Sequence, residues 1–130
     1  MHKKLISSAV ALLVGAATMM AGEPAISLET TSHDFGNISE DGGPVSCEFE
    51  FTNTGDEPLV IISANASCGC TRPEYPKKPV QPGKTGKIKV TYLPTGRPGE
   101  FSKTVRVRTN APRPKRINLN ITGVVIPANK

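Results

Sequence analysis

Apolar and polar residues alternate one by one along several short segments of this chain, and this period limits the fold that it can adopt. The clearest segment is 45–52, where Val45, Cys47, Phe49 and Phe51 alternate with polar residues. Because successive side chains of a β-strand point to opposite faces of a sheet, this segment predicts a strand with one buried face. A helix would instead need apolar residues three and four positions apart. The chain is therefore expected to form β structure.

Other segments repeat this pattern, and turn-forming residues separate them. Alternation is seen at 87–92, 101–108 and 117–122, and weaker strand signals lie at 26–29 and 33–38. The run Leu59–Ile62 is apolar throughout, which is typical of a strand that is buried on both faces or that covers a partner site. The 12 glycines and 12 prolines disfavour long helices and favour short strands joined by turns. We predict an all-β fold, an immunoglobulin-like antiparallel β-sandwich of about seven strands.

The first 21 residues have the features of a secretory signal peptide. Lys3 and Lys4 precede an uncharged, mostly apolar segment, Leu5–Met20. This segment is shorter than the roughly 20 residues that a membrane-spanning helix needs, so we expect export and cleavage near Ala21. Residues 22–130 would then form a single domain in the bacterial periplasm or outside the cell. No second apolar stretch follows, so stable membrane insertion after cleavage is not expected.

Five short motifs occur in the order in which a known family carries them. They are His33–Ile38 (HDFGNI), Phe51–Gly55 (FTNTG), Pro58–Ile61 (PLVI), Ser67–Thr71 (SCGCT) and Pro82–Gly86 (PGKTG). Together they closely resemble the secreted bacterial family of the domain of unknown function 1573, over nearly all of residues 22–130. The resemblance implies an immunoglobulin-like sandwich related to Hydin-type and chaperone-like modules. It implies no particular biochemical activity.

The three cysteines are the most chemically suggestive residues. Cys68 and Cys70 flank Gly69, and Cys47 lies on the inward face of its predicted strand. In an extended chain, residues two apart are separated by about 6.6–6.8 Å, at the limit of disulfide reach. A bond between Cys68 and Cys70 therefore needs a tight turn. Cys47 could instead pair with either of them, or remain a buried core thiol.

Two functional interpretations of these cysteines stay open beside a structural one. Two thiolates suit Cu(I) or Zn(II), but a four-ligand zinc site would need His33 and all three cysteines. A thiol-redox pair is the other interpretation, although redox enzymes favour two residues between the cysteines and a following helix. Here only Gly69 separates Cys68 from Cys70, and no helical pattern follows them. We therefore favour structural or inert cysteines and expect no cofactor, with copper or zinc at Cys68 and Cys70 as the alternative.

Charge is divided sharply along the chain. Residues 23–67 contain nine acidic and no basic residues, whereas 68–130 contain fourteen lysines and arginines and two glutamates. In an immunoglobulin-like strand order, the acidic strand at 45–52 lies beside the lysine-bearing strand at 87–92, so opposite charges would meet. The residues concerned are Glu48, Glu50, Lys87 and Lys89.

Three arginines, Arg106, Arg108 and Arg116, are not matched by this pairing. We expect them on the outer face of the other sheet, flanking the apolar segment Leu59–Ile62. Exposed apolar area rimmed by polar groups is typical of interaction sites, so this face is the candidate partner surface. The proline-rich basic loop after the cysteines offers Tyr75 as an exposed contact residue. The expected partner is a protein or an anionic envelope glycan.

Other classes of function find little support in the residues. His33 is the one histidine after residue 21, and its neighbour Asp34 would point to the opposite face of a strand, so no catalytic triad is indicated. The six aromatic residues lie mostly at inward positions and offer no stacking platform for nucleic acid. The sequence thus predicts an exported, non-enzymatic binding or assembly module of the bacterial envelope. The alternative is a periplasmic metal-handling or thiol-redox protein.

Overall fold

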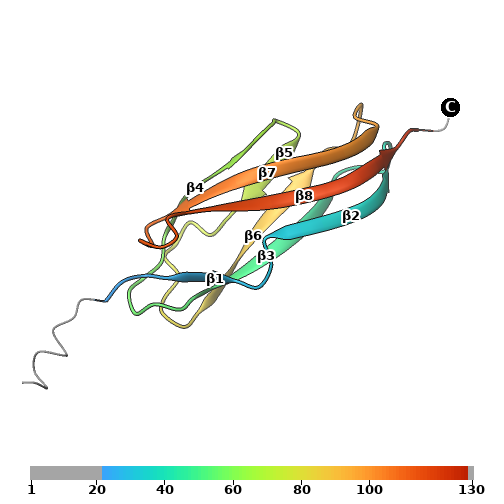
Figure 1. Ribbon diagram of the computed structural model, residues 1–130. Coiled ribbons are helices and arrows are strands. Elements are labelled where there is room, and N and C mark those ends of the chain that lie inside the picture. The colour runs from blue at the N-terminus through green and yellow to red at the C-terminus, as the bar shows by residue number, and fades with distance from the viewer. Residues whose placement is uncertain (1–21, 129–130) are drawn as a thin grey trace, which may run out of the picture.

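The computed structural model describes residues 22–128, which form two β-sheets packed face to face (Figure 1). The strands are β1 (Ile26–Leu28), β2 (Ser32–Ser39), β3 (Val45–Asn53), β4 (Ile61–Ala66), β5 (Thr71–Glu74), β6 (Thr85–Tyr92), β7 (Gly99–Thr109) and β8 (Arg116–Ile126). The expected signal peptide, residues 1–21, lies outside the described residues. Within residues 22–128, no helix is long and apolar enough to cross a membrane.

Each sheet has four strands. The first sheet has the order β1-β3-β6-β5 and the second has the order β2-β8-β7-β4. Neighbouring strands are antiparallel except β2 and β8, which run parallel. The prediction of an all-β sandwich is confirmed, with eight strands rather than about seven and with one parallel pair.

The core lies between the sheets and consists of the inward-facing residues of the four long central strands. The first sheet contributes Phe49, Phe51, Ile88 and Val90, and the second contributes Val105, Val107, Leu119 and Ile121. Each is at most 1% exposed, and such burial stabilises the fold by about 1.5–3 kcal/mol per large side chain. Tyr92 of β6 and Phe101 of β7 stack with ring centroids 3.9 Å apart, which joins the two sheets.

The strand expected at Leu59–Ile62 begins later and continues further than predicted. Leu59 is fully buried but forms only an isolated bridge with Val80. β4 starts at Ile61 and runs to Ala66, and its register against β7 shifts between Ile61 and Ser63. Ile62 follows the buried Ile61 and so faces outward, where its side chain is 47% exposed. The segment is therefore not buried on both faces, and that interpretation of the apolar run is wrong.

A short strand occupies part of the segment that was predicted to be a loop. β5 pairs with β6 and contains Pro73, which lies opposite Val90. Proline cannot donate a ladder hydrogen bond, so it is tolerated on an edge strand such as this one. This position at the edge of the first sheet explains how a proline-rich segment joins the sandwich.

Opposite charges meet across the outer face of the first sheet, as the sequence predicts. Glu48 lies opposite Lys89 in the register of β3 and β6, and Glu50 lies opposite Lys87. Lys87 Nζ also lies 3.6 Å from Glu48 Oε1. Because both side chains of this ion pair are more than half exposed, its contribution to stability is small.

Asn53, the last residue of β3, ties three segments together from a fully buried position. Its Nδ2 donates hydrogen bonds to the carbonyl oxygens of Glu57 (2.8 Å) and Val80 (2.9 Å). Its Oδ1 accepts hydrogen bonds from the backbone N–H groups of Gly55 (2.9 Å) and Ala25 (3.4 Å). The side chain thus satisfies backbone groups before β1, after β3 and before β6.

We predict that Asn53→Asp destabilises the domain, because its carboxylate would face two carbonyl oxygens in place of an amide donor. The free energy of unfolding, measured by urea denaturation at neutral pH, should fall by about 2–4 kcal/mol. The control is Asn118→Asp on the exposed outer face of β8, which should change stability by less than about 0.5 kcal/mol. Equal losses in the two variants would contradict this role for Asn53.

Candidate functional site

Cys68 and Cys70 form a disulfide across Gly69, in the turn between β4 and β5. Their Cα atoms are 5.3 Å apart, closer than in an extended chain, because the backbone turns here. The Thr71 N–H donates a hydrogen bond to the Cys68 carbonyl oxygen (3.3 Å), and the Cys70 N–H donates one to Cys68 Sγ (3.1 Å). Of the pairings that the sequence left open, the bond within the Cys-Gly-Cys motif is the one formed.

The two sulfurs of this disulfide have different surroundings. Cys70 is 1% exposed and belongs to the core, and its carbonyl oxygen accepts a hydrogen bond from the Leu93 N–H (2.8 Å). Its Sγ lies 3.6 Å from Thr71 Oγ1. Cys68 is only half-buried. Gly69 is exposed, and a Cβ added there would meet no atom within 4 Å outside its two chain neighbours, Cys68 and Cys70. The disulfide can therefore be approached from the side of Cys68.

This disulfide adds little to the stability of the fold. In the chain-entropy account, a bond that closes a three-residue loop contributes about 1.5 kcal/mol, against about 3 kcal/mol for a fifteen-residue loop. A bond from Cys47 would have closed the longer kind of loop. The bond that forms is thus the one that constrains the unfolded chain least.

Cys47 is a buried free thiol. It lies opposite Val90, and β6 separates its strand from β5. Burial raises the pKa of Cys47 to about 11, and the nearby Glu48 carboxylate adds to this effect. The thiol is therefore held protonated and unreactive.

The four candidate metal ligands are not brought together. His33 lies on β2, and β4, which leads to Cys68, forms the opposite edge of the same sheet. The His33 ring packs edge-on against Phe35, with centroids 4.6 Å apart. Within residues 22–128, no group of three or more histidine, cysteine or acidic side chains is placed to hold a metal ion. The Cys₃His arrangement considered for zinc is not formed here.

The three arginines lie together on the outer face of the second sheet. Arg108 of β7 lies directly opposite Arg116 of β8. Arg106 lies between Asn65 of β4 and Asn118 of β8. All three arginine side chains are exposed. In the part of the chain that the structure describes, none of them forms an ion pair.

The expectation of an apolar strip beside these arginines is wrong. Ser63 and Asn65 are the residues of β4 that face outward next to Arg108 and Arg106, and Ile62 at the bulge is the one large exposed apolar side chain of that strand. Two adjoining hollows cross this face. The first hollow is lined by Asn65, Ala66, Ser67, Thr104, Arg106 and Asn118. The second is lined by Ser63, Asn65, Arg106, Val107, Arg108 and Arg116. The surface is polar and cationic rather than apolar.

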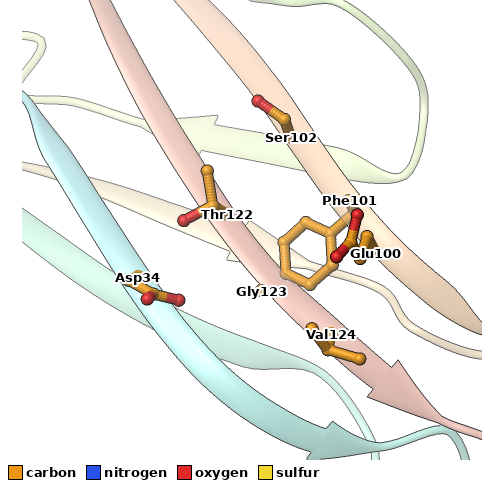
Figure 2. Close-up of a pocket in the computed structure, with 7 residues that line it drawn as sticks. All are labelled: Asp34, Glu100, Phe101, Ser102, Thr122, Gly123 and Val124. Carbon is orange, nitrogen blue, oxygen red and sulfur yellow. The ribbon is translucent and has the colours of Figure 1, made fainter.

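The other end of the same face is acidic, which the sequence analysis missed. Figure 2 shows Asp34 on β2 and Glu100 on β7, on the two sides of β8, around a hollow above Gly123 and Phe101. Parallel pairing places Asp34 opposite Thr122, and Glu100 lies opposite Val124. The two residues are distant in sequence, so only the strand order reveals that they share a surface.

Tyr75, expected to be an exposed contact residue, is partly buried. Its ring packs against the core, and Lys77 Nζ lies 3.8 Å from the ring centroid. This cation–π contact covers the ring. Tyr75 also belongs to the segment after β5, outside the arginine-bearing face. It is therefore not a free anchor for a partner on that face.

Solved structures define the class of fold. The chain is similar to a protein of unknown function from Porphyromonas gingivalis W83 (16% identity, TM-score 0.69), covering 78% of this chain and 47% of that one. It thus spans about half of that protein. It is also similar to the PapD-like domain 7 of human CEP192 (15% identity, TM-score 0.62), covering 82% of this chain and 89% of that one. A third similar structure is the periplasmic chaperone SfaE (16% identity, TM-score 0.53), covering 81% of this chain and 59% of that one. The fold is an immunoglobulin-type, PapD-like sandwich.

The family is identified by its own sequence pattern. Residues 26–125 match the family described as a protein of unknown function, DUF1573, and the chain belongs to this family. This confirms the family resemblance carried by the five sequence motifs. No curated protein matches the chain.

The raised pKa of Cys47 predicts a dependence of stability on alkaline pH. The thiol ionises more readily in the unfolded chain than in the folded one, so the free energy of unfolding should fall as the pH rises from 9 toward 11. Urea denaturation of the wild type should show this fall, and Cys47→Val should show less of it. Tyr92, whose pKa burial also raises, is present in both proteins, so their difference isolates Cys47. Parallel pH profiles would contradict the assignment.

Proposed function

We propose that this chain is an exported protein-binding module of the bacterial cell envelope, and that the outer face of the second sheet is its binding surface. The observation that carries the proposal is the distribution of charge on this face. Three arginines without ion-pair partners in residues 22–128 lie at one end, and two carboxylates border a hollow at the other.

The fold supports a binding role. The chain shares its sandwich with a protein named as a periplasmic chaperone and with a PapD-like domain, although at low sequence identity. A module of this kind needs a rigid scaffold with an exposed face, and the two packed sheets provide one. The signal-like sequence of residues 1–21 supports placement in the envelope.

The charge pattern favours a polypeptide over an anionic glycan. A uniformly acidic polymer lying along β7 would meet Arg106 and Arg108 but would be repelled by Glu100 at the other end of the strand. A polypeptide can carry charges of both signs and match both ends. Outward residues on β7 are spaced about 6.8 Å apart, the same repeat as alternate residues of an extended peptide. We therefore infer an extended partner segment that places acidic residues over the arginines.

We predict that the double variant Arg106→Glu with Arg108→Glu loses its envelope partner. A photo-crosslinking residue at position 118 of the exported full-length chain should capture a discrete protein band, and the double variant should remove that band. The control is Lys78→Glu with Lys84→Glu, an equal change in charge on exposed loops, which should leave the band in place. A crosslinker at Glu50, on the outer face of the first sheet, should give no such band.

Two results would contradict the proposal. One is a crosslinking pattern at position 118 that the arginine reversals leave unchanged. The other is recovery of the signal-bearing chain in the cytoplasmic fraction with residues 1–21 still attached. A polygalacturonate column that retains the wild type and releases the arginine variant, without any protein crosslink, would replace the polypeptide partner by an anionic glycan.

A further inference from the structure

The two cysteines of the Cys68–Cys70 disulfide differ in exposure. Cys70 is 1% exposed and lies in the core, whereas Cys68 is half-buried and is followed by the exposed Gly69. A thiolate that attacks a disulfide must reach the sulfur with which it bonds. An incoming thiolate can therefore bond with Cys68 Sγ, and Cys70 Sγ is the leaving sulfur.

Two polar groups are placed to assist an exchange of this kind. The Cys70 N–H donates a hydrogen bond to Cys68 Sγ (3.1 Å), and such a donor stabilises a thiolate on Cys68 when the bond is open. Thr71 Oγ1 lies 3.6 Å from Cys70 Sγ, so its hydroxyl can donate to the sulfur that leaves. Each sulfur of the pair thus has its own donor within the same turn.

The same disulfide contributes little to the fold, because it closes the shortest of the loops open to these cysteines. Opening it need not disturb the core, since Cys70 is also held by the backbone hydrogen bond from Leu93. These features separate it from a bond whose role is to stabilise the domain.

We propose that Cys68 and Cys70 form a thiol–disulfide exchange site that acts on dithiols of other polypeptides. This activity goes beyond the proposed binding role and uses a different part of the molecule. A substrate thiolate bonds with Cys68 Sγ while the Cys68–Cys70 bond breaks, and the electron pair of that bond leaves on Cys70 Sγ. The second thiolate of the substrate then attacks the substrate sulfur of the mixed disulfide and releases Cys68 as a thiolate.

The overall exchange is balanced. The substrate dithiol loses two electrons and two protons and becomes a disulfide, and the Cys68–Cys70 disulfide gains them and becomes a dithiol. A second disulfide, such as glutathione disulfide, restores the oxidised site by the same steps in reverse. In the reduced form, Cys68 is the attacking thiolate and Cys70 resolves the mixed disulfide.

The first test uses Cys70→Ser and Cys68→Ser in the full chain, each reduced and then mixed with glutathione disulfide. Intact mass and peptide mapping should show one glutathione on Cys68 of Cys70→Ser. In Cys68→Ser, modification of Cys70 should be slower by more than an order of magnitude, because that sulfur is buried. Cys47 should stay unmodified in both. Equal modification rates of Cys68 and Cys70 would overturn the proposed asymmetry.

The second test measures turnover of a short peptide dithiol in a glutathione buffer. The folded wild type should accelerate disulfide formation above the buffer rate, and both serine variants should lose this acceleration. Gly69→Val should slow the reaction, because its branched side chain fills the space beside Cys68, whereas Gly69→Ala should slow it less. Urea denaturation of each variant checks that the fold is kept.

No acceleration by the folded wild type would overturn the proposal, whatever the variants do. An acceleration retained in Cys68→Ser would also overturn it, since Cys47 or Cys70 would then be the reacting group. Loss of the arginine-dependent crosslink would leave this activity unaffected, so the two proposals fail separately.

Discussion

The stacked rings of Tyr92 and Phe101 join the two sheets, and several other features depend on where these rings lie. Phe101 fits beneath β8 because Gly123 has no side chain, and a Cβ there would come within 2.7 Å of the ring. Phe35 extends the aromatic contact to β2. In the first sheet, Leu93 follows Tyr92, and its N–H donates a hydrogen bond to the Cys70 carbonyl oxygen. This hydrogen bond positions the turn that carries the disulfide. The same interior contact therefore supports both the acidic hollow and the proposed exchange site.

Much of the fold follows from local pattern, and the exceptions have physical reasons. The alternation at 45–52 and 87–92 predicts β3 and β6, and an immunoglobulin-like strand order predicts that their opposite charges meet; the exact register is set by the structure. The extent of β4 was missed because Ala64 and Ala66, which face the core, are too small to give an apolar signal. β5 was missed because a proline usually excludes a strand, and only its edge position makes Pro73 acceptable.

The candidate sites were less accessible to sequence reasoning because they depend on strand order. The outward position of Arg106 and Arg108 follows from alternation along one strand, but their polar neighbours come from β4 and β8. Nothing near Asp34 in the sequence indicates that it shares a face with Glu100. The choice of disulfide partner depended in turn on how the backbone turns at Gly69, which spacing alone left open.

The parallel pairing of β2 with β8 has a consequence for the order in which the domain is completed. β2 begins at Ser32, and its sheet neighbour β8 ends at Ile126. The chain is made from its N-terminus, and on the proposed export it would also cross the membrane in that order. β2 therefore has no strand partner until nearly the whole domain has emerged. β1 meets β3 much sooner, because a single strand separates them in the chain. The second sheet therefore closes last, and until then the backbone of β2 is open to solvent and to other chains.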